Sequence, residues 1–327
     1  SLSAVNAAIK AKTPTDVDTV DELRTIAVAA RDAQAKITTY AGDKADNSAP
    51  TSGETGAPTQ ADFEAMGVQG VRSTADAGKP ASLAAVLAAL ATDVVTSAKT
   101  ASASLVQGIV DSYNKILGLA DGTPDNTTDA AATPVATDYA NIGLAAASVT
   151  QLGDASTLKL LNSAVDAQPA TRASVDKPSE IQDLLNAVNK VLAYAKGGTT
   201  APTLDELALL GITGVTSDSL PAVLAKIAQV PDADVSSIDT IGELQTLADK
   251  AKAAQAKIAA YADTNSGTTP TASDYADMGV NLPTTPAVSA AVAAAILGAT
   301  NAALASTPID KSKGDTPSEV QVIVDSY

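Results

Sequence analysis

The sequence predicts an all-α fold, a tandem array of small three-helix bundles (long helix, short helix, medium helix) that forms an elongated rod. Three observations lead to this prediction. A Lys motif recurs four times, a segment of fixed length from Pro to Gly follows each copy, and apolar residues recur at helical spacing. A unit of about 70 residues that repeats in this way is typical of an array of similar modules.

The first element of each unit is predicted to be a long helix of about 20 residues. Its start carries a capping box, in which a hydroxyl residue is followed three positions later by Glu. Near its end comes a Lys, then Ile or Val, and three residues later Tyr or Leu followed by Ala. The predicted boxes are Thr19 with Glu22, Thr240 with Glu243 and Thr316 with Glu319, whereas Asp176 is the predicted cap of the third long helix.

The second element is predicted to be a helix of two turns. Each copy begins at a Pro and reaches a Gly nine positions later, where a left-handed C-cap belongs. An apolar pair at spacing i, i+3 lies between them. The segments run over 58–67, 134–143, 202–211 and 270–279, and the apolar pairs are Phe63/Met66, Tyr139/Ile142, Leu207/Leu210 and Tyr275/Met278.

The third element is predicted to be a medium helix with one apolar face. Its face residues are Leu83/Val86/Leu90, Leu158/Leu161/Val165, Leu220/Val223/Ile227 and Ser289/Val292/Ile296, and Leu2/Val5/Ile9 shows the same spacing. The predicted organisation is a repeat tail over 1–16, helical repeats over 17–100, 101–175, 176–237 and 238–314, and the start of another repeat over 315–327. The partial units at the two ends predict a longer polypeptide.

Composition narrows the function classes. The chain has 37 acidic and 21 basic residues and a net charge of −16, so we expect binding neither to nucleic acid nor to anionic membranes. It contains no Cys and no His, which removes thiolate chemistry and the commonest general base. No nucleophile with a base and no phosphate-binding loop is recognisable. We therefore expect a non-enzymatic protein without catalytic or cofactor-binding residues, and no segment long and apolar enough for membrane insertion.

Two sets of loop acids are weak candidates for calcium: Asp121, Asp125 and Asp129, and Asp232 and Asp234. Neither set follows the alternating-ligand pattern of a calcium loop, so solvated turns are the competing interpretation. Calcium is the one cofactor considered.

Two repeated residue types could contact a ligand. Tyr40, Tyr194 and Tyr261 could form a ladder that stacks on glycans, but we expect each ring to pack between helices with its hydroxyl in water. Lys36, Lys115, Lys190 and Lys257 could contact a partner, but we expect solvated charges whose stems cover apolar surface.

The run from Leu210 to Thr216, followed by Leu220 and Val223 and then by Ile238 to Leu244, resembles the Ala/Thr-rich tandem helical repeats, GA-like three-helix modules, of very large bacterial cell-surface and adhesin proteins. The resemblance covers nearly the whole chain. It implies an extracellular protein at the bacterial surface that acts as the stalk or spacer of an adhesin or as a surface coat. No albumin-binding residues can be matched.

The partners expected from an array are the neighbouring repeats of the same polypeptide. Two alternatives stay open. Exposed apolar surface repeated in every module would favour self-assembly of copies of the chain into a filament, sheath or surface layer. A patch in one module alone would favour a module that binds a host protein or a glycan.

Overall fold

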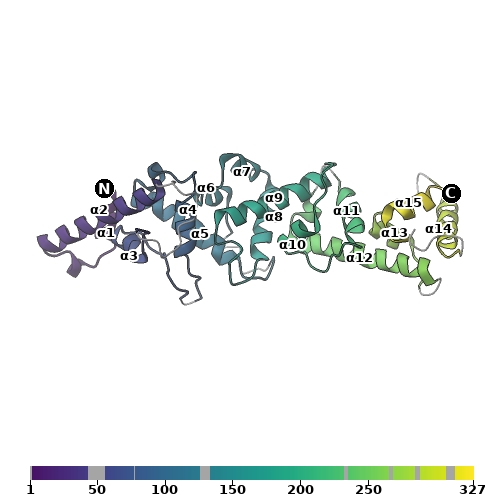
Figure 1. The fold of residues 1–327 in the computed structure, drawn as a ribbon, viewed down its shortest axis with the longest axis horizontal. Helices are drawn as coiled ribbons and strands as arrows, with labels where there is room; N and C mark the ends of the chain where they lie inside the picture. Colours follow the sequence, from purple (N-terminus) through teal and green to yellow (C-terminus); the bar gives the residue numbers. More distant parts are fainter. Residues whose placement is uncertain are drawn as a thin grey trace. The chain divides into compact units, whose positions relative to one another are not determined.

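The computed structural model describes residues 2–42, 56–76, 78–125, 133–231, 235–264, 268–283, 288–306 and 314–327. Regular structure in these ranges is helical, which confirms the all-α class (Figure 1). These ranges also contain an isolated antiparallel β-bridge between Asp76 and Lys79. The chain divides into two compact units, Ser1–Leu185 and Asn186–Tyr327.

The helices follow one another along the chain as expected, with additions. In order they are α1 (Leu2–Lys10), η1 (Pro14–Asp16), α2 (Val20–Gly42), α3 (Gln60–Ala65), α4 (Leu83–Leu90), η2 (Ser97–Thr100), α5 (Ala103–Leu119), α6 (Ala136–Asn141), α7 (Ala146–Gln151), α8 (Ala155–Asp166), α9 (Pro178–Ala195), α10 (Leu204–Leu209), α11 (Leu220–Ala228), η4 (Ser236–Ile238), α12 (Ile241–Thr264), α13 (Ala272–Met278), α14 (Ala290–Leu304) and α15 (Pro317–Val324). Helix α7 and the three 3-10 turns were not predicted.

The long helices begin where the capping residues indicate. In α2 and α15 the hydroxyl residue and the Glu three positions later exchange the hydrogen bonds of a capping box. The prediction for α9 is wrong by one residue. Helix α9 begins at Pro178, and it is the backbone N–H of Lys177, not Asp176, that donates to Glu180. Pro178 supplies the first helical φ, so the cap falls on the residue directly before it.

The short helices α3, α10 and α13 begin with capping boxes and end at the predicted left-handed glycines. Gly279 has φ +91°, and a Cβ there would lie 2.5 Å from the Cβ of Ala225 on α11. Gly67 approaches the backbone of α1 in the same way. Glycine is therefore required twice over, by its conformation and by close contact with the preceding medium helix.

The medium helix α14 differs from the prediction. Ser289 and Val292 are exposed and Ile296 is only partly buried, whereas Thr300, Asn301 and Leu304 form the buried face. The Ala-rich run around Val292 satisfies helical spacing at several registers, and spacing alone selected the wrong one. The buried face lies near the C-terminal end of the helix.

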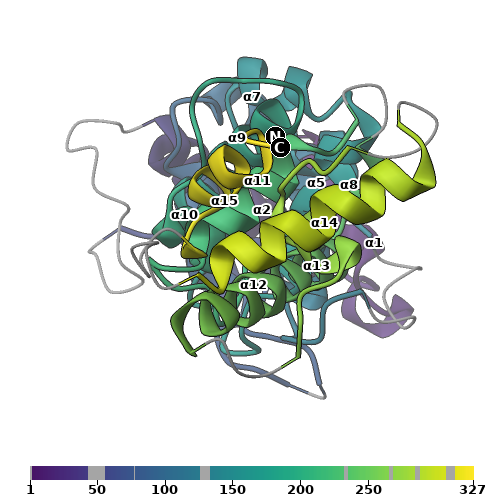
Figure 2. The same cartoon turned by 90° about the vertical axis from the view of Figure 1, so that its right-hand side faces the viewer.

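The core of each unit is built from long helices flanked by medium and short ones. In the first unit α1 packs on α2 and α2 on α3, and α4 and α6 both pack on α5. In the second unit α11, α12 and α13 pack mutually (Figure 1), and α14 packs against α15 (Figure 2). The medium helix beside each of these long helices is the one that precedes it in sequence, which places the short-helix glycine against it.

Candidate functional site

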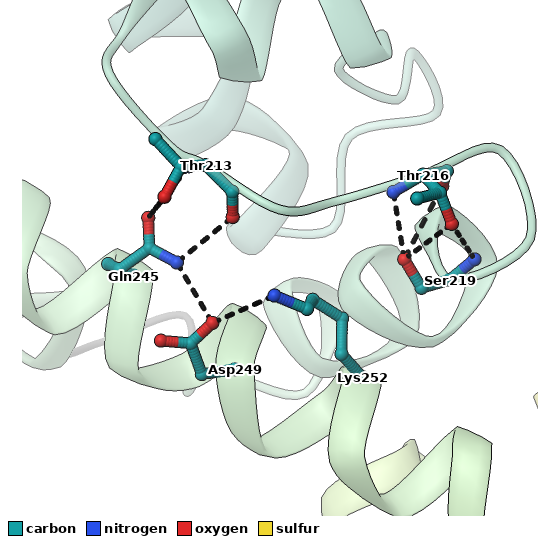
Figure 3. A network of polar contacts seen from close by, with 6 residues as sticks. All are labelled: Thr213, Thr216, Ser219, Gln245, Asp249 and Lys252. Atoms are coloured by element: carbon teal, nitrogen blue, oxygen red, sulfur yellow. Dashed lines mark hydrogen bonds and ion pairs between the residues drawn. The ribbon is translucent and has the colours of Figure 1, made fainter.

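The most specific repeated contact is made by a Gln side chain that binds both the N–H and the carbonyl of one loop residue. In the second unit, Gln245 on α12 accepts a hydrogen bond from the Thr213 N–H at 2.8 Å and donates to the Thr213 carbonyl at 3.1 Å (Figure 3). Asp249, one turn later, accepts from the same amide nitrogen at 3.0 Å. Lys252 donates to Asp249 at 3.0 Å. We call the pairing of this Gln with both polar groups of one peptide residue the Gln clamp.

The Gln clamp occurs three times among the described residues. Gln107 on α5 holds Gln69 at 2.8 and 2.9 Å, and Gln321 on α15 holds Asn281 at 2.7 and 3.2 Å. Asp111 and Asp325 take the place of Asp249 and accept from the Gln amide at 2.8 Å each.

The register of the clamp is fixed by two helix ends. Each clamping Gln stands five residues after the cap of a long helix, and the residue it holds stands two after the glycine of the preceding short helix. The left-handed glycine turns the chain so that this backbone runs past the long helix. The Asp fixes which end of the Gln amide donates, because Nε2 must face it. Each hydrogen bond contributes about 0.5–1.5 kcal/mol net.

Figure 3 also shows how the clamped loop leads into the medium helix. Thr216 N–H donates to Ser219 Oγ at 3.0 Å, and Ser219 N–H donates to Thr216 Oγ1 at 3.4 Å. This reciprocal pair satisfies amides at the start of α11. The loop between α10 and α11 is therefore fixed at the clamp and again at the helix start.

A second repeated contact joins each long helix to its short helix. The Lys motif places an ammonium against the carboxylate at the start of the short helix: Lys36 to Asp62 at 2.7 Å, Lys115 to Asp138 at 3.1 Å, Lys190 to Glu206 at 2.8 Å and Lys257 to Asp274 at 2.6 Å. We expected solvated charges, and the four Lys side chains are 25–42% exposed, but each ammonium is also paired with a carboxylate, which was not predicted. The partner acid stands three residues after the N-cap of the short helix, a tertiary contact that reading the long helix by itself does not reveal.

The acid of each pair both accepts the hydrogen bond from the backbone N–H at the start of the short helix and binds the Lys ammonium. Asp274 accepts from the Thr271 N–H at 2.6 Å as well as from Lys257. Burial raises the pKa of Asp274, but the hydrogen bonds from Lys257 and Thr271 outweigh it, and the net pKa lies below its ordinary value. The same balance lowers the pKa of Asp62 and of Glu206. The three carboxylates are thus held in the charged form.

A third contact links a short helix to the medium helix that follows it. Tyr275 Oη donates to Asn301 Oδ1 at 2.6 Å, and Asn301 Nδ2 donates to the Pro270 carbonyl at 3.0 Å. In the first unit, Tyr139, Asn162 and Pro134 repeat it at 2.6 and 2.9 Å. Burial raises the pKa of both tyrosines well above the ordinary range. Both hydroxyls therefore act as neutral donors.

The sequence itself holds the signal for these contacts. Gln107, Gln245 and Gln321 each precede an Asp by four residues at a fixed distance from a helix start, and Gln182 stands at the same place in α9. There, Ser148 on the inserted α7 donates to Gln182 Oε1 at 2.7 Å. Likewise, Asn162 follows Leu161 and Asn301 follows Thr300 in the medium helices whose short helix carries a Tyr. Leu87 and Leu224 stand at this place where the short helix carries Phe63 or Leu207.

The predicted site residues are placed as follows. Tyr40, Tyr194 and Tyr261 are partly exposed, and the fully buried tyrosines Tyr113, Tyr139 and Tyr275 lie elsewhere.

Asp121 accepts from the Thr123 N–H at 2.8 Å, and Asp125 Oδ1 accepts from Ser163 at 2.7 Å. The calcium candidates Asp129, Asp232 and Asp234 lie outside the described residues. Within the described ranges, no cluster of three acidic, His or Cys side chains could hold a metal ion.

Comparison with protein-family models, curated proteins and solved structures found no match. In the part of the chain that the structure describes, no helix combines the length and apolar character needed to cross a membrane.

Proposed function

We propose that the chain is a non-enzymatic structural region in which tandem helical bundles form an extended stalk or spacer. Each bundle in this proposal comprises a long helix, its short helix and a neighbouring medium helix. The function in this proposal is mechanical, because the repeated contacts among the described residues hold one segment of backbone against the next.

The observation that carries the proposal is the recurrence of the Gln clamp. A clamp joins the end of one short helix to the start of the next long helix, so its repetition at one register is what an array of joined modules requires. The Lys–carboxylate pairs support it as well, since they fix each short helix to its own long helix in four places.

The placement of this stalk on a bacterial cell surface rests on the resemblance to Ala/Thr-rich surface repeats. The net charge of −16 supports solubility of such a region. We propose no cofactor, and the partners of each module are its neighbours in the same polypeptide.

Small-angle X-ray scattering of the chain tests the proposal. An array gives a maximum dimension several times its cross-section, whereas a globule of 327 residues has a radius of gyration of about 20 Å. A value near the globular one would overturn the extended stalk. Sedimentation over a range of concentrations separates this from the alternative of self-assembly, which would raise the apparent mass with concentration.

A further inference from the structure

We propose that the starts of α1 and α2 together form a docking face for a short helix of the chain's own repeat type, supplied by a repeat placed N-terminal to it. The inference rests on the proposed array and names the partner that this face accepts. The occupant is defined by its chemistry: two helical turns that carry a Tyr, preceded by a Pro carbonyl and ended by Gly.

The first half of the face is on α1. Residues 2–9 share a pattern with 158–165 in α8 and 297–304 in α14, namely Leu, an apolar or Thr residue three later, Asn directly after it, and an aliphatic residue three beyond. In α8 and α14 that Asn is buried, accepts from a Tyr hydroxyl and donates to a Pro carbonyl. Its counterpart Asn6 is exposed, and Leu2 is 72% exposed.

The second half of the face is on α2. Val20, the first residue of α2, is 72% exposed, whereas Ala103 and Ile241 at the same place in α5 and α12 are 4% and 2% exposed. Leu23 and Ala27 follow on the same side and are partly exposed. Their counterparts Leu244 and Ala248 in α12 are fully buried. The start of α2 thus presents an apolar side that is covered in the other long helices.

One occupant accounts for both halves. In the second unit, α13 reaches the medium helix α14 through Tyr275 and Asn301, while Asn281, just after α13, is clamped by Gln321 on α15. A short helix therefore contacts the next medium helix and the next long helix together. Helices α1 and α2 are such a pair in sequence, and their open sides are the ones that a preceding short helix would cover.

The clamp position of α2 defines how this occupant is held. Arg24 stands where the other long helices have Gln, and Val28 stands where α5, α12 and α15 have Asp. A guanidinium donates but cannot accept, so it can bind the carbonyl of the docked loop and not its N–H. We expect the joint at this face to hold through apolar packing and Asn6 more than through a clamp.

The source of the occupant is a neighbouring repeat rather than a second copy. Within the described residues, the short helices that carry a Tyr are α6 and α13, and both are already held: Tyr139 and Tyr275 donate to Asn162 and Asn301, and the segment after α13 is clamped by Gln321. A second copy would have to release one of these contacts in order to offer a short helix. A repeat joined in sequence needs no such exchange.

A chimera in which residues 216–296 precede residues 2–327 tests the proposal. It supplies a complete α11–α12–α13 segment, and the copied Tyr275 stands 26 residues before Asn6, the separation between Tyr275 and Asn301 in the chain itself. Amide hydrogen exchange, followed by mass spectrometry, should slow about tenfold in α1 and at the start of α2, as expected for a segment that gains two ordinary hydrogen bonds and apolar cover.

The substitution Asn6→Leu provides the matched control. It should leave exchange in the original chain unchanged, because Asn6 is exposed there, and reverse the protection of α1 in the chimera. Tyr275→Phe in the copied segment should have the same effect, and the two changes together should cost no more than one alone.

An appended segment that folds without slowing exchange in α1, or that stays unfolded beside the face, overturns the proposal. Self-association of the original chain that Asn6→Leu abolishes would also overturn it, by assigning the face to a second copy. Because scattering from the original chain is measured separately, failure of this inference is distinguishable from failure of the proposed stalk.

Discussion

Tyr275 and Asn301 form a buried hydrogen bond of 2.6 Å that joins α13 to α14. The Asn amide is used at both ends, since its Nδ2 donates to the Pro270 carbonyl that begins the short-helix segment. The bond therefore fixes the phase of α14, which the apolar residues around Val292 leave undetermined.

Removing one partner of this bond should destabilise the second unit more than removing both. Tyr275→Phe or Asn301→Leu leaves a buried polar group unsatisfied and should cost about 1–3 kcal/mol in the free energy of unfolding. The double variant recreates the apolar combination found at Phe63 and Leu87 and should recover most of the loss. Urea unfolding of the full chain measures this, and additive losses in the double variant would contradict the coupling.

Loss of a Gln clamp should loosen the segment that follows the short helix. Gln245→Ala removes the two backbone hydrogen bonds to Thr213 and the longer one from its hydroxyl, and should cost about 1–2 kcal/mol. Gln245→Glu keeps the acceptor but places a second carboxylate beside Asp249, so the Thr213 carbonyl loses its donor and the loss should be larger. Exchange of the Thr213 amide should accelerate in both variants. Lys250→Ala, an exposed change on the same helix, serves as the control and should leave that amide unaffected.

Acid should weaken the joints between long and short helices. The pKa values of Asp62, Glu206 and Asp274 are lowered in the folded chain, so folding favours their charged forms. Their contribution is therefore complete above the ordinary values of 3.8 for Asp and 4.5 for Glu, and it is lost as the pH falls through the lower folded values.

A variant separates this effect from general acid unfolding. Lys257→Met removes the cation but keeps an apolar stem, so the folded pKa of Asp274 should rise towards its ordinary value. Stability at neutral pH should fall by about 1 kcal/mol, and the dependence on pH below 3.8 should become shallower. Carboxyl titration by NMR is the measurement. An Asp274 pKa that does not rise would contradict the role of Lys257.

Two glycine substitutions should have opposite signs. Gly279→Ala requires a side chain at φ +91° and brings its Cβ to 2.5 Å from Ala225, so it should destabilise by about 2–4 kcal/mol. Gly298→Ala lies inside α14 with no atom within 4 Å of the added Cβ and should stabilise by about 0.5–1 kcal/mol. Thermal unfolding of both variants checks the pair, and equal effects would rule out close contact as the cause.

Helix ends were predictable because their signals are local. Thr59 and Asp62 lie within one turn, and Gly67 ends the same helix, so cap and stop are visible without knowledge of the fold. The choice of face in α14 was not predictable from spacing, because Ala at most positions gives no register. It is set by Tyr275, which reaches Asn301 from another helix.

The repeated tertiary contacts were less predictable than the helix ends and more predictable than the buried face of α14. Lys257 and Asp274 are 17 residues apart, and nothing local pairs them. The four Lys and the four acids recur together, however, and a comparison of the repeats with one another would have identified them. The Gln clamp carries the same kind of signal in its Asp four residues later. The inserted α7 has no helical counterpart among the described residues of the other repeats, so comparing the repeats would not have predicted it.

In all three copies the Gln clamp binds the backbone N–H and carbonyl of one residue, and at Thr213 the side-chain hydroxyl also donates to Gln245 Oε1, at 3.4 Å. The three residues it holds are Gln69, Thr213 and Asn281, which differ in size and chemistry, yet their N–H and carbonyl are bound alike. The amino-acid sequence of each clamped segment can therefore change without weakening its contact with the long helix, because the contacts common to the three copies are made to the backbone. A polypeptide of this kind can change the side chains that it exposes at each clamped segment separately, while the coupling between successive segments keeps its geometry.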